Sequence, residues 1–278
     1  MSLLSGGLSL NDSIEDISAQ IKNKPQDADL RIHLFQYLSF LGLWDRAKSQ
    51  LEVCAKLNKQ SIPMVAMYQS MIQAEQKREQ VVLGKNSPKI IGVDEASQLH
   101  AEQMFTALNA EIKGDFEQAL SLRQSVLDQT AENPCQIKSV QPDGKLFNEI
   151  ESNHGWLMDA DTRFSNVCEF YRNGEYYWIP FAAIQTMTLL APKSSTDLIW
   201  VNASIVLKND DQEHIGVIPA RYPLLQDKTS LSDMLLTCKT TGWQEKDGGF
   251  WGEGQKVFTT DQDDFGLLDI RHIDFGLS

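Results

Sequence analysis

The residues whose types and spacing could do chemistry are concentrated between His154 and Phe181. Asp159 and Asp161 alternate along the chain, and His154 precedes them while Glu169 follows them. Alternate carboxylates can chelate a hard cation when the backbone turns, and clustered titratable groups suit acid–base chemistry. One interpretation of this segment is therefore a metal- or small-ligand-binding enzyme domain centred on Asp159, Asp161 and Glu169.

A structural interpretation of the same segment competes with the catalytic one, and we favour it. The segment lacks a second histidine at ligand spacing, and the cation of Arg163 is close enough in sequence to pair with Asp159 or Asp161. We therefore expect one of these aspartates to cap a helix or to hold Arg163 in a partly buried salt bridge. On this interpretation the chain has no catalytic residue, no metal site and no cofactor.

The other candidate motifs are incomplete. The run from Asp261 to His272 follows an EF-hand loop in part, but Phe265 stands where an Asp or Asn is needed and His272 replaces the bidentate Glu. The cysteines are far apart and form no C-x-x-C pair, which indicates reduced structural thiols. They are Cys54, Cys135, Cys168 and Cys238.

The elements that must position these residues begin with helical hairpins in the first half. Two segments, 40–47 and 113–120, share a glycine, an aromatic residue two positions later and an alanine three beyond that. This is the turn of a tetratricopeptide repeat, and the glycines are 72 positions apart (114 − 42), close to twice the ~34-residue period of that repeat. The spacing predicts hairpins around Gly42 and Gly114, an intervening helix over 63–82, and a loop over 84–92.

Stacked hairpins of this kind leave one curved face open to a partner. The helical register places two sets of residues on that inner face, mostly apolar, and such a lining suits a partner's amphipathic helix. The first set is Ile32, Gln36, Ser39 and Phe40, and the second is Met104, Leu108, Glu111 and Ile112. Two alternatives stay open: the same stripe packs on neighbouring helices or the chain's own second domain, or it forms a homodimer.

The second half is predicted to be α+β with a mostly antiparallel sheet. A turn at 140–144 marks the expected boundary between a tetratricopeptide-like domain, 1–139, and an acidic domain, 140–278. Beyond it, runs of β-branched and aromatic residues predict strands, and one short helix is expected over 230–237. The strands are expected over 175–181, 198–207, 214–222 and 267–275.

Charge and hydropathy argue against a nucleic-acid-binding protein and against a membrane-spanning one. Residues 1–139 carry 14 Lys+Arg and 17 Asp+Glu, a net −3, whereas residues 140–278 carry 11 and 21, a net −10. Such an acidic surface repels phosphate backbones, which argues against nucleic-acid binding. The chain has no apolar run long enough for a membrane span and its first residues do not resemble a secretory signal, so we expect a cytoplasmic protein.

Taken together, the helical half, the segment after it and the acidic end resemble the ImpE family, also called SciE or TagJ. These are accessory proteins of bacterial type VI secretion systems. The resemblance covers nearly the whole chain and rests most on a set of residues in the 156–181 segment. They are Trp156, Asp159, Asp161, Arg163, Glu169, Tyr177 and Trp178.

The resemblance implies a non-enzymatic cytoplasmic adaptor. Proteins similar to this chain associate with the small subunit of the contractile sheath and are thought to link it to a ClpV-type unfoldase. The expected mode of binding is a helical segment of that sheath subunit lying along the apolar inner face, on Ile32, Gln36, Phe40, Met104, Leu108 and Ile112.

Overall fold

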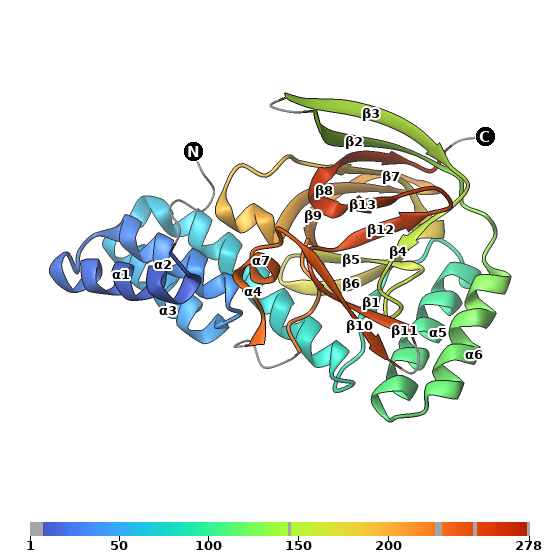
Figure 1. Cartoon of the computed structure of the whole chain (residues 1–278), viewed down its shortest axis with the longest axis horizontal. Coiled ribbons are helices and arrows are strands. Elements are labelled where there is room, and N and C mark those ends of the chain that lie inside the picture. Colours follow the sequence, from blue (N-terminus) through green and yellow to red (C-terminus); the bar gives the residue numbers. More distant parts are fainter. Residues whose placement is uncertain (1–7, 144–145, 226–229, 247–248, 277–278) are drawn as a thin grey trace.

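The fold, taken from a computed structural model, places helices first and strands after them. The structure describes residues 8–143, 146–225, 230–246 and 249–276. Figure 1 shows the helices α1 to α3 at one end of the molecule, α4 running along the sheet, and α5 and α6 at the other end. The longer helices are α1 (Leu10–Asn23), α2 (Ala28–Phe40), α3 (Trp44–Leu57), α4 (Ile62–Val82), α5 (Glu95–Ile112) and α6 (Phe116–Gln129).

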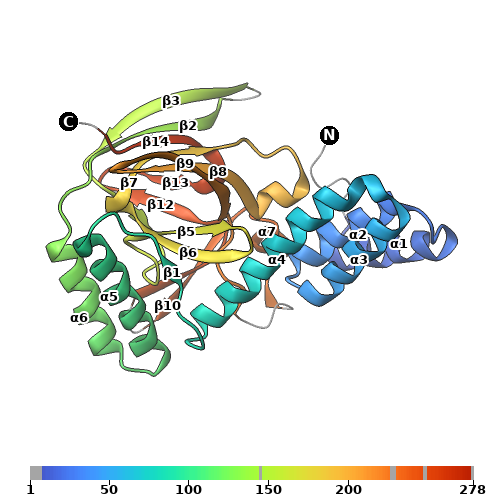
Figure 2. The same ribbon diagram turned by 180° about the vertical axis from the view of Figure 1, so that it is seen from behind.

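Both predicted hairpins are present, and glycine makes each turn. Gly42 joins α2 to α3 with φ 60°, and Gly114 joins α5 to α6 with φ 83°. Residues with a Cβ rarely adopt this left-handed conformation. The alanines of the two motifs, Ala47 and Ala119, are both fully buried, as close helix packing requires. The two hairpins do not stack directly on each other, because they lie at opposite ends of α4 (Figure 2).

The strands form one large sheet and two small ones, which confirms the predicted mostly antiparallel α+β half. The large sheet has the order β1-β6-β5-β9-β8-β7-β14-β2-β3, and its only parallel pair among the described residues is β1 with β6. Its strands are β1 (Lys89–Ile90), β2 (Cys135–Asp143), β3 (Leu146–His154), β5 (Val167–Arg172), β6 (Glu175–Pro180), β7 (Ile184–Leu189), β8 (Trp200–Leu207), β9 (Asp210–Pro219) and β14 (Ile270–Asp274).

The smaller sheets lie beside the 156–181 segment. One is an antiparallel ribbon of β10 (Thr241–Lys246) and β11 (Gly249–Gly254), and the other has the order β13-β12-β4. The strands of the latter are β4 (Leu157–Asp159), β12 (Val257–Thr260) and β13 (Asp264–Gly266). The predicted short helix is present as α7 (Asp233–Leu236).

Two details of the chain's organisation differ from expectation. The loop predicted over 84–92 contains β1, which pairs with Tyr177 and Trp178 of β6, so the helical half contributes a strand to the large sheet. Helix α6 ends at Gln129 and β2 starts at Cys135 and continues to Asp143, so the change from helix to strand precedes the turn predicted at 140–144. Gly144 of that turn lies outside the described residues.

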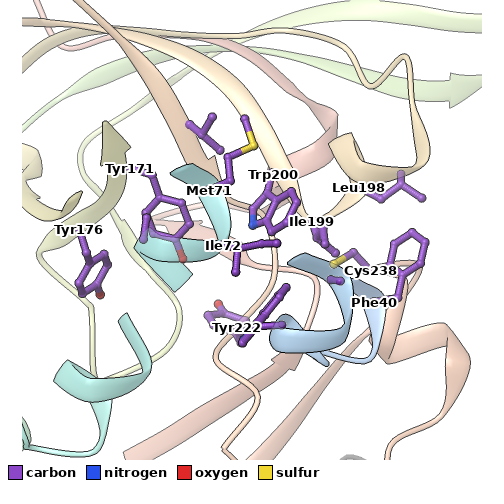
Figure 3. Close-up of a cluster of buried hydrophobic side chains, with 14 of the residues drawn as sticks. Phe40, Met71, Ile72, Tyr171, Tyr176, Leu198, Ile199, Trp200, Tyr222 and Cys238 are labelled. Carbon is purple, nitrogen blue, oxygen red and sulfur yellow. The ribbon is translucent and has the colours of Figure 1, made fainter. Parts of the chain in front are cut away.

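The core covers the face that the sequence predicted to be open. Phe40, Met104 and Leu108 are at most 1% exposed and belong to the same apolar cluster as Trp178 and Trp200 of the sheet half. Figure 3 shows Phe40 beside Leu198, Ile199 and Cys238 from the second half of the chain.

The remaining predicted groove positions differ widely in solvent exposure. Ser39 and Glu111 are also buried, Ile32 and Gln36 are half-buried, and Ile112 is 39% exposed. The expected open apolar groove is therefore corrected: its central side chains are buried in an apolar cluster that also contains residues of the chain's own sheet half. The alternative that the stripe packs against the second half is the one that the burial of these residues supports.

All four cysteines are free and buried. Burial raises the pKa of Cys135 and of Cys238 to about 12, which keeps both thiols protonated at neutral pH. No helix among the described residues is both long enough and apolar enough to cross a membrane.

Candidate functional site

The polar residues of the 156–181 segment converge in a tight turn between β4 and β5. The Asp161 N–H donates to Asp159 Oδ1 at 3.0 Å, and the Arg163 N–H donates to Asp161 Oδ1 at 2.9 Å. Aspartate side chains favour this kind of local bond to a backbone amide two positions on. The turn therefore places both carboxylates and the guanidinium of Arg163 inside the molecule, where all three residues are buried.

These residues belong to a chain of buried ion pairs that crosses from the helical half to the sheet half. Arg78 of α4 donates to Glu169 of β5 through Nε at 2.7 Å and Nη2 at 2.5 Å. Lys256 Nζ is 3.0 Å from Glu169 Oε2 and also forms an ion pair with Asp159. We call the connected set the buried charge network. It comprises Glu75, Arg78, Asp159, Asp161, Arg163, Glu169 and Lys256.

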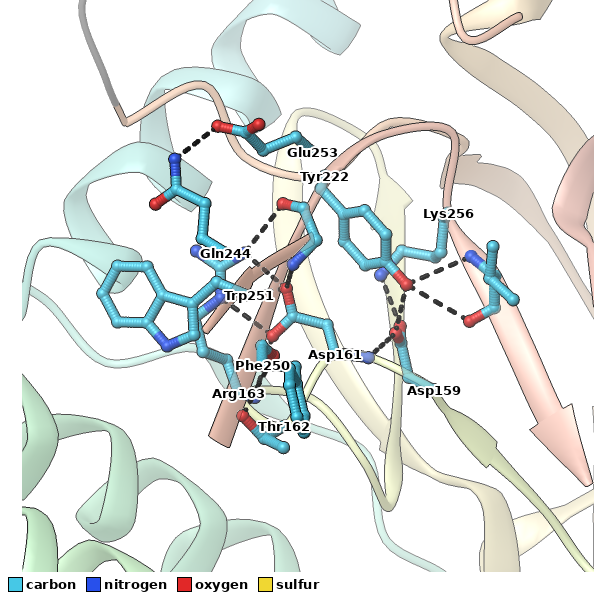
Figure 4. A network of polar contacts seen from close by, with 12 residues as sticks. Asp159, Asp161, Thr162, Arg163, Tyr222, Gln244, Phe250, Trp251, Glu253 and Lys256 are labelled. Carbon is cyan, nitrogen blue, oxygen red and sulfur yellow. Dashed lines mark hydrogen bonds and ion pairs between the residues drawn. The ribbon is translucent and has the colours of Figure 1, made fainter. Parts of the chain in front are cut away.

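Neutral donors add further hydrogen bonds to these carboxylates. Tyr176 Oη donates to Glu169 Oε1 at 2.5 Å, and Tyr222 Oη donates to Asp159 Oδ1 at 3.0 Å. Asp161 Oδ2 accepts from the Gly252 N–H at 2.7 Å in addition to its ion pair with Arg163, and Figure 4 shows Phe250 and Trp251 of β11 beside these two residues. Since buried charges are tolerated only when paired and hydrogen-bonded, this set of partners explains how the network can lie in the core.

The network does not stabilise the ionised form of its carboxylates equally. It holds four carboxylates and three cations, and two of the carboxylates have pKa values shifted in opposite directions. Burial raises the pKa of Asp159 to about 6 against the opposing effect of Lys256, and the neighbouring charge of Asp161 adds to the rise. Burial also acts to raise the pKa of Glu169, but Arg78 and Lys256 outweigh it and lower that pKa to about 2. Of these two carboxylates, Glu169 is therefore the one more firmly held in its ionised form.

The structure brings together three of the four residues that the sequence suggested for chemistry. Asp159, Asp161 and Glu169 share the network, whereas His154 hydrogen-bonds Thr260 and Ser152 outside it. The expected structural salt bridge is confirmed as Asp161 with Arg163, and it is fully rather than partly buried. Among the described residues, no group of three or more His, Cys, Asp or Glu is arranged to hold a metal ion.

Sequence reasoning missed the partners that come from far along the chain, namely Glu75, Arg78, Tyr222 and Lys256. The sequence did contain a signal for Glu75 and Arg78. They lie on the face of α4 that also carries Ile72 and Val82, so the helical period places both charges on a buried stripe. Nothing in the local sequence marks Tyr222 or Lys256.

The raised pKa of Asp159 predicts a specific pH dependence of stability. Because the folded protein holds the Asp159 proton more tightly than the unfolded chain, this group stabilises the fold below pH 4 and the contribution is lost as pH rises through about 6. Lowering the pH from 7 to 4.5 should therefore raise the free energy of unfolding of the wild type relative to that of Asp159→Asn. The gain should not exceed about 3 kcal/mol. Urea unfolding of both proteins at the two pH values measures the difference. A wild type that loses stability relative to Asp159→Asn when the pH falls from 7 to 4.5 would contradict the prediction.

A cavity of about 250 Å³ lies next to the network, where α5 and α6 meet the start of β5 and the end of β6. The ends of the 156–181 segment form part of its wall, including the half-buried Trp156 and the buried Phe181. Leu127 of α6 lines it from the helical side. Asn166, which also lines it, donates weakly to Thr130 Oγ1 at 3.5 Å, while its buried Oδ1 has no hydrogen-bond partner.

The other residues of the family-like set lie in or beside the same region. Trp178 is fully buried and donates through Nε1 to Tyr176 Oη at 2.5 Å, which continues the polar contacts of Glu169. Tyr177 is half-buried, and Lys89 Nζ lies 5.9 Å from its ring centroid. The motif therefore has a buried polar centre and a partly exposed apolar margin.

Known proteins resemble this chain in sequence and in fold. The family model described as ImpE protein matches residues 151–274. A type VI secretion system accessory component, TagJ of Pseudomonas aeruginosa, is 32% identical over 266 residues, which is 96% of this chain and 87% of that protein. The crystal structure of protein VPA1032 from Vibrio parahaemolyticus has the same fold, with a TM-score of 0.80 and 19% identity over 95% of this chain and 93% of that one. The chain belongs to the ImpE/TagJ family of type VI secretion accessory components.

Proposed function

We propose that this protein is a non-enzymatic cytoplasmic adaptor of a type VI secretion system. It binds a helical segment of the small contractile-sheath subunit and links that subunit to a ClpV-type unfoldase. The observation that carries the proposal is the 32% identity to an accessory component over almost the full length of both chains. Similarity of that extent includes the helical half as well as the sheet half, so it supports a shared role of the whole protein.

The geometry of the network favours a structural rather than a catalytic role for these charges. The carboxylates of the network all have a cation or a hydroxyl, amide or indole donor within hydrogen-bonding distance, and these partners come from the chain itself. A general acid or base must instead reach a substrate atom. The charges of the segment therefore serve to join α4, β4, β5 and β11 into one body.

Co-purification with the sheath components tests the proposal. The full chain, the small sheath subunit and the unfoldase are mixed pairwise and together and separated by size-exclusion chromatography with light scattering. We expect a complex with the small sheath subunit that is lost when its helical segment is deleted, and a three-component complex with the unfoldase. Absence of any complex with the intact sheath subunit would overturn the adaptor role.

A further inference from the structure

The hairpin formed by α5 and α6 is far more acidic than its length would suggest. Residues 94–133 contain eight Asp+Glu and two Lys+Arg, a net −6 from 2 − 8. Of the lysine and arginine in this hairpin, Arg123 is buried in an ion pair with Glu111, which leaves Lys113 on the outside. Such a surface attracts cations and raises the rate of encounter with positively charged partners.

The outer face of α6 also exposes leucines. Ala119, Arg123 and Val126 form its buried side, whereas Leu120 is 56% exposed and Leu127 is 39% exposed. Positions seven apart lie on the same face of a helix, about 10 Å from each other along its axis. This face of α6 is therefore a short apolar stripe flanked by acidic residues, including Glu117 and Asp128.

The stripe ends at the cavity. Leu127 is part of the cavity wall, and the wall continues through Trp156, Phe181 and the half-buried Ala182. A cavity of about 150 Å³ can hold benzene, so this one, at about 250 Å³, has room for a large apolar side chain. The orphan Oδ1 of Asn166 offers a hydrogen-bond acceptor in the wall.

We propose that the outer face of α6 and this cavity together bind a positively charged amphipathic helix, one large apolar side chain of which enters the cavity. The negative charge around the site favours a positively charged partner. Glu132 lines the cavity together with His100, Asp128 lies four positions before Glu132 in the chain, and the C-terminal end of α6 adds a partial negative charge at the same place. A second copy of this chain, with a net charge of −13, is disfavoured by repulsion.

This inference rests on the proposed function, because it locates the surface on which the sheath subunit's helical segment docks. Two substitutions remove the site in different ways. Ala182→Phe fills the cavity from its wall, and Leu127→Glu puts a charge into the stripe. The matched control is Leu190→Glu, which places the same charge at a residue 55% exposed just beyond β7.

The experiment titrates the purified small sheath subunit against each protein, with folding checked by circular dichroism. We expect Ala182→Phe and Leu127→Glu to weaken binding at least tenfold while Leu190→Glu stays within twofold of the wild type. The double variant Asp128→Asn, Glu132→Gln should show a weaker dependence of Kd on salt than the wild type.

The outcomes separate the two proposals. If the wild type binds and both site variants, correctly folded, bind within twofold of it, the α6 site is overturned and the adaptor role stands. If the wild type itself does not bind the sheath subunit, both are overturned. If the Leu190→Glu control loses binding as strongly as Leu127→Glu, added charge alone explains the loss and the site is overturned.

Discussion

Replacing Glu169 with Gln should lower the free energy of unfolding by about 3–5 kcal/mol, the cost of breaking a buried ion pair from one side. Glu169 is the centre of the network, since it accepts from Arg78, Lys256 and Tyr176. The substitution keeps the shape of the side chain but leaves two cations facing an uncharged amide. Equilibrium unfolding in urea at pH 7 measures the loss.

The matched control for this prediction is Glu175→Gln in the neighbouring strand. Glu175 also pairs with two cations, Lys77 at 2.5 Å and Lys89 at 3.1 Å, but its side chain is 30% exposed. Ion pairs at the surface contribute less than about 1 kcal/mol because water screens them. Equal losses for the two variants would show that burial does not distinguish the network from an ordinary surface pair.

Replacing Trp200 with Ala should also destabilise the protein by about 3–5 kcal/mol, the range for removing a large aromatic side chain from a core. Trp200 is 1% exposed, and its ring contacts aromatic rings of α2, α3 and α4. Its Nε1 donates to Glu75 at 2.9 Å, so the substitution also leaves that buried carboxylate with one partner fewer. The rings around it are those of Phe35, Trp44 and Tyr68.

Two further variants test the reason for this effect. Trp243→Ala removes the same side chain from the β10–β11 ribbon, where it is 44% exposed, and should cost about 1 kcal/mol or less. Trp200→Phe keeps most of the apolar contact but loses the bond to Glu75, so it should fall between the other two. Circular dichroism at increasing denaturant follows all three. A Trp200→Ala protein as stable as Trp243→Ala would show that the two halves do not depend on this contact.

Several features could be predicted from the sequence because they depend on neighbours in the chain. The turns at Gly42 and Gly114 need only a left-handed glycine, an aromatic residue and an alanine within six positions. The salt bridge of Asp161 with Arg163 joins residues two positions apart. The alternation of β-branched and aromatic residues likewise predicted strands close to β6 and β8.

What only the tertiary structure decided is which surfaces meet. Helical periodicity shows that the side of α2 with Phe40 and the side of α5 with Leu108 are apolar, but it cannot show whether a partner or the chain's own sheet covers them. The partners of Glu169 make the same point: Arg78 is 91 positions away and Lys256 is 87 (256 − 169). A charge is tolerated in the core only when its counter-charge arrives there, and chain folding alone brings such distant residues together.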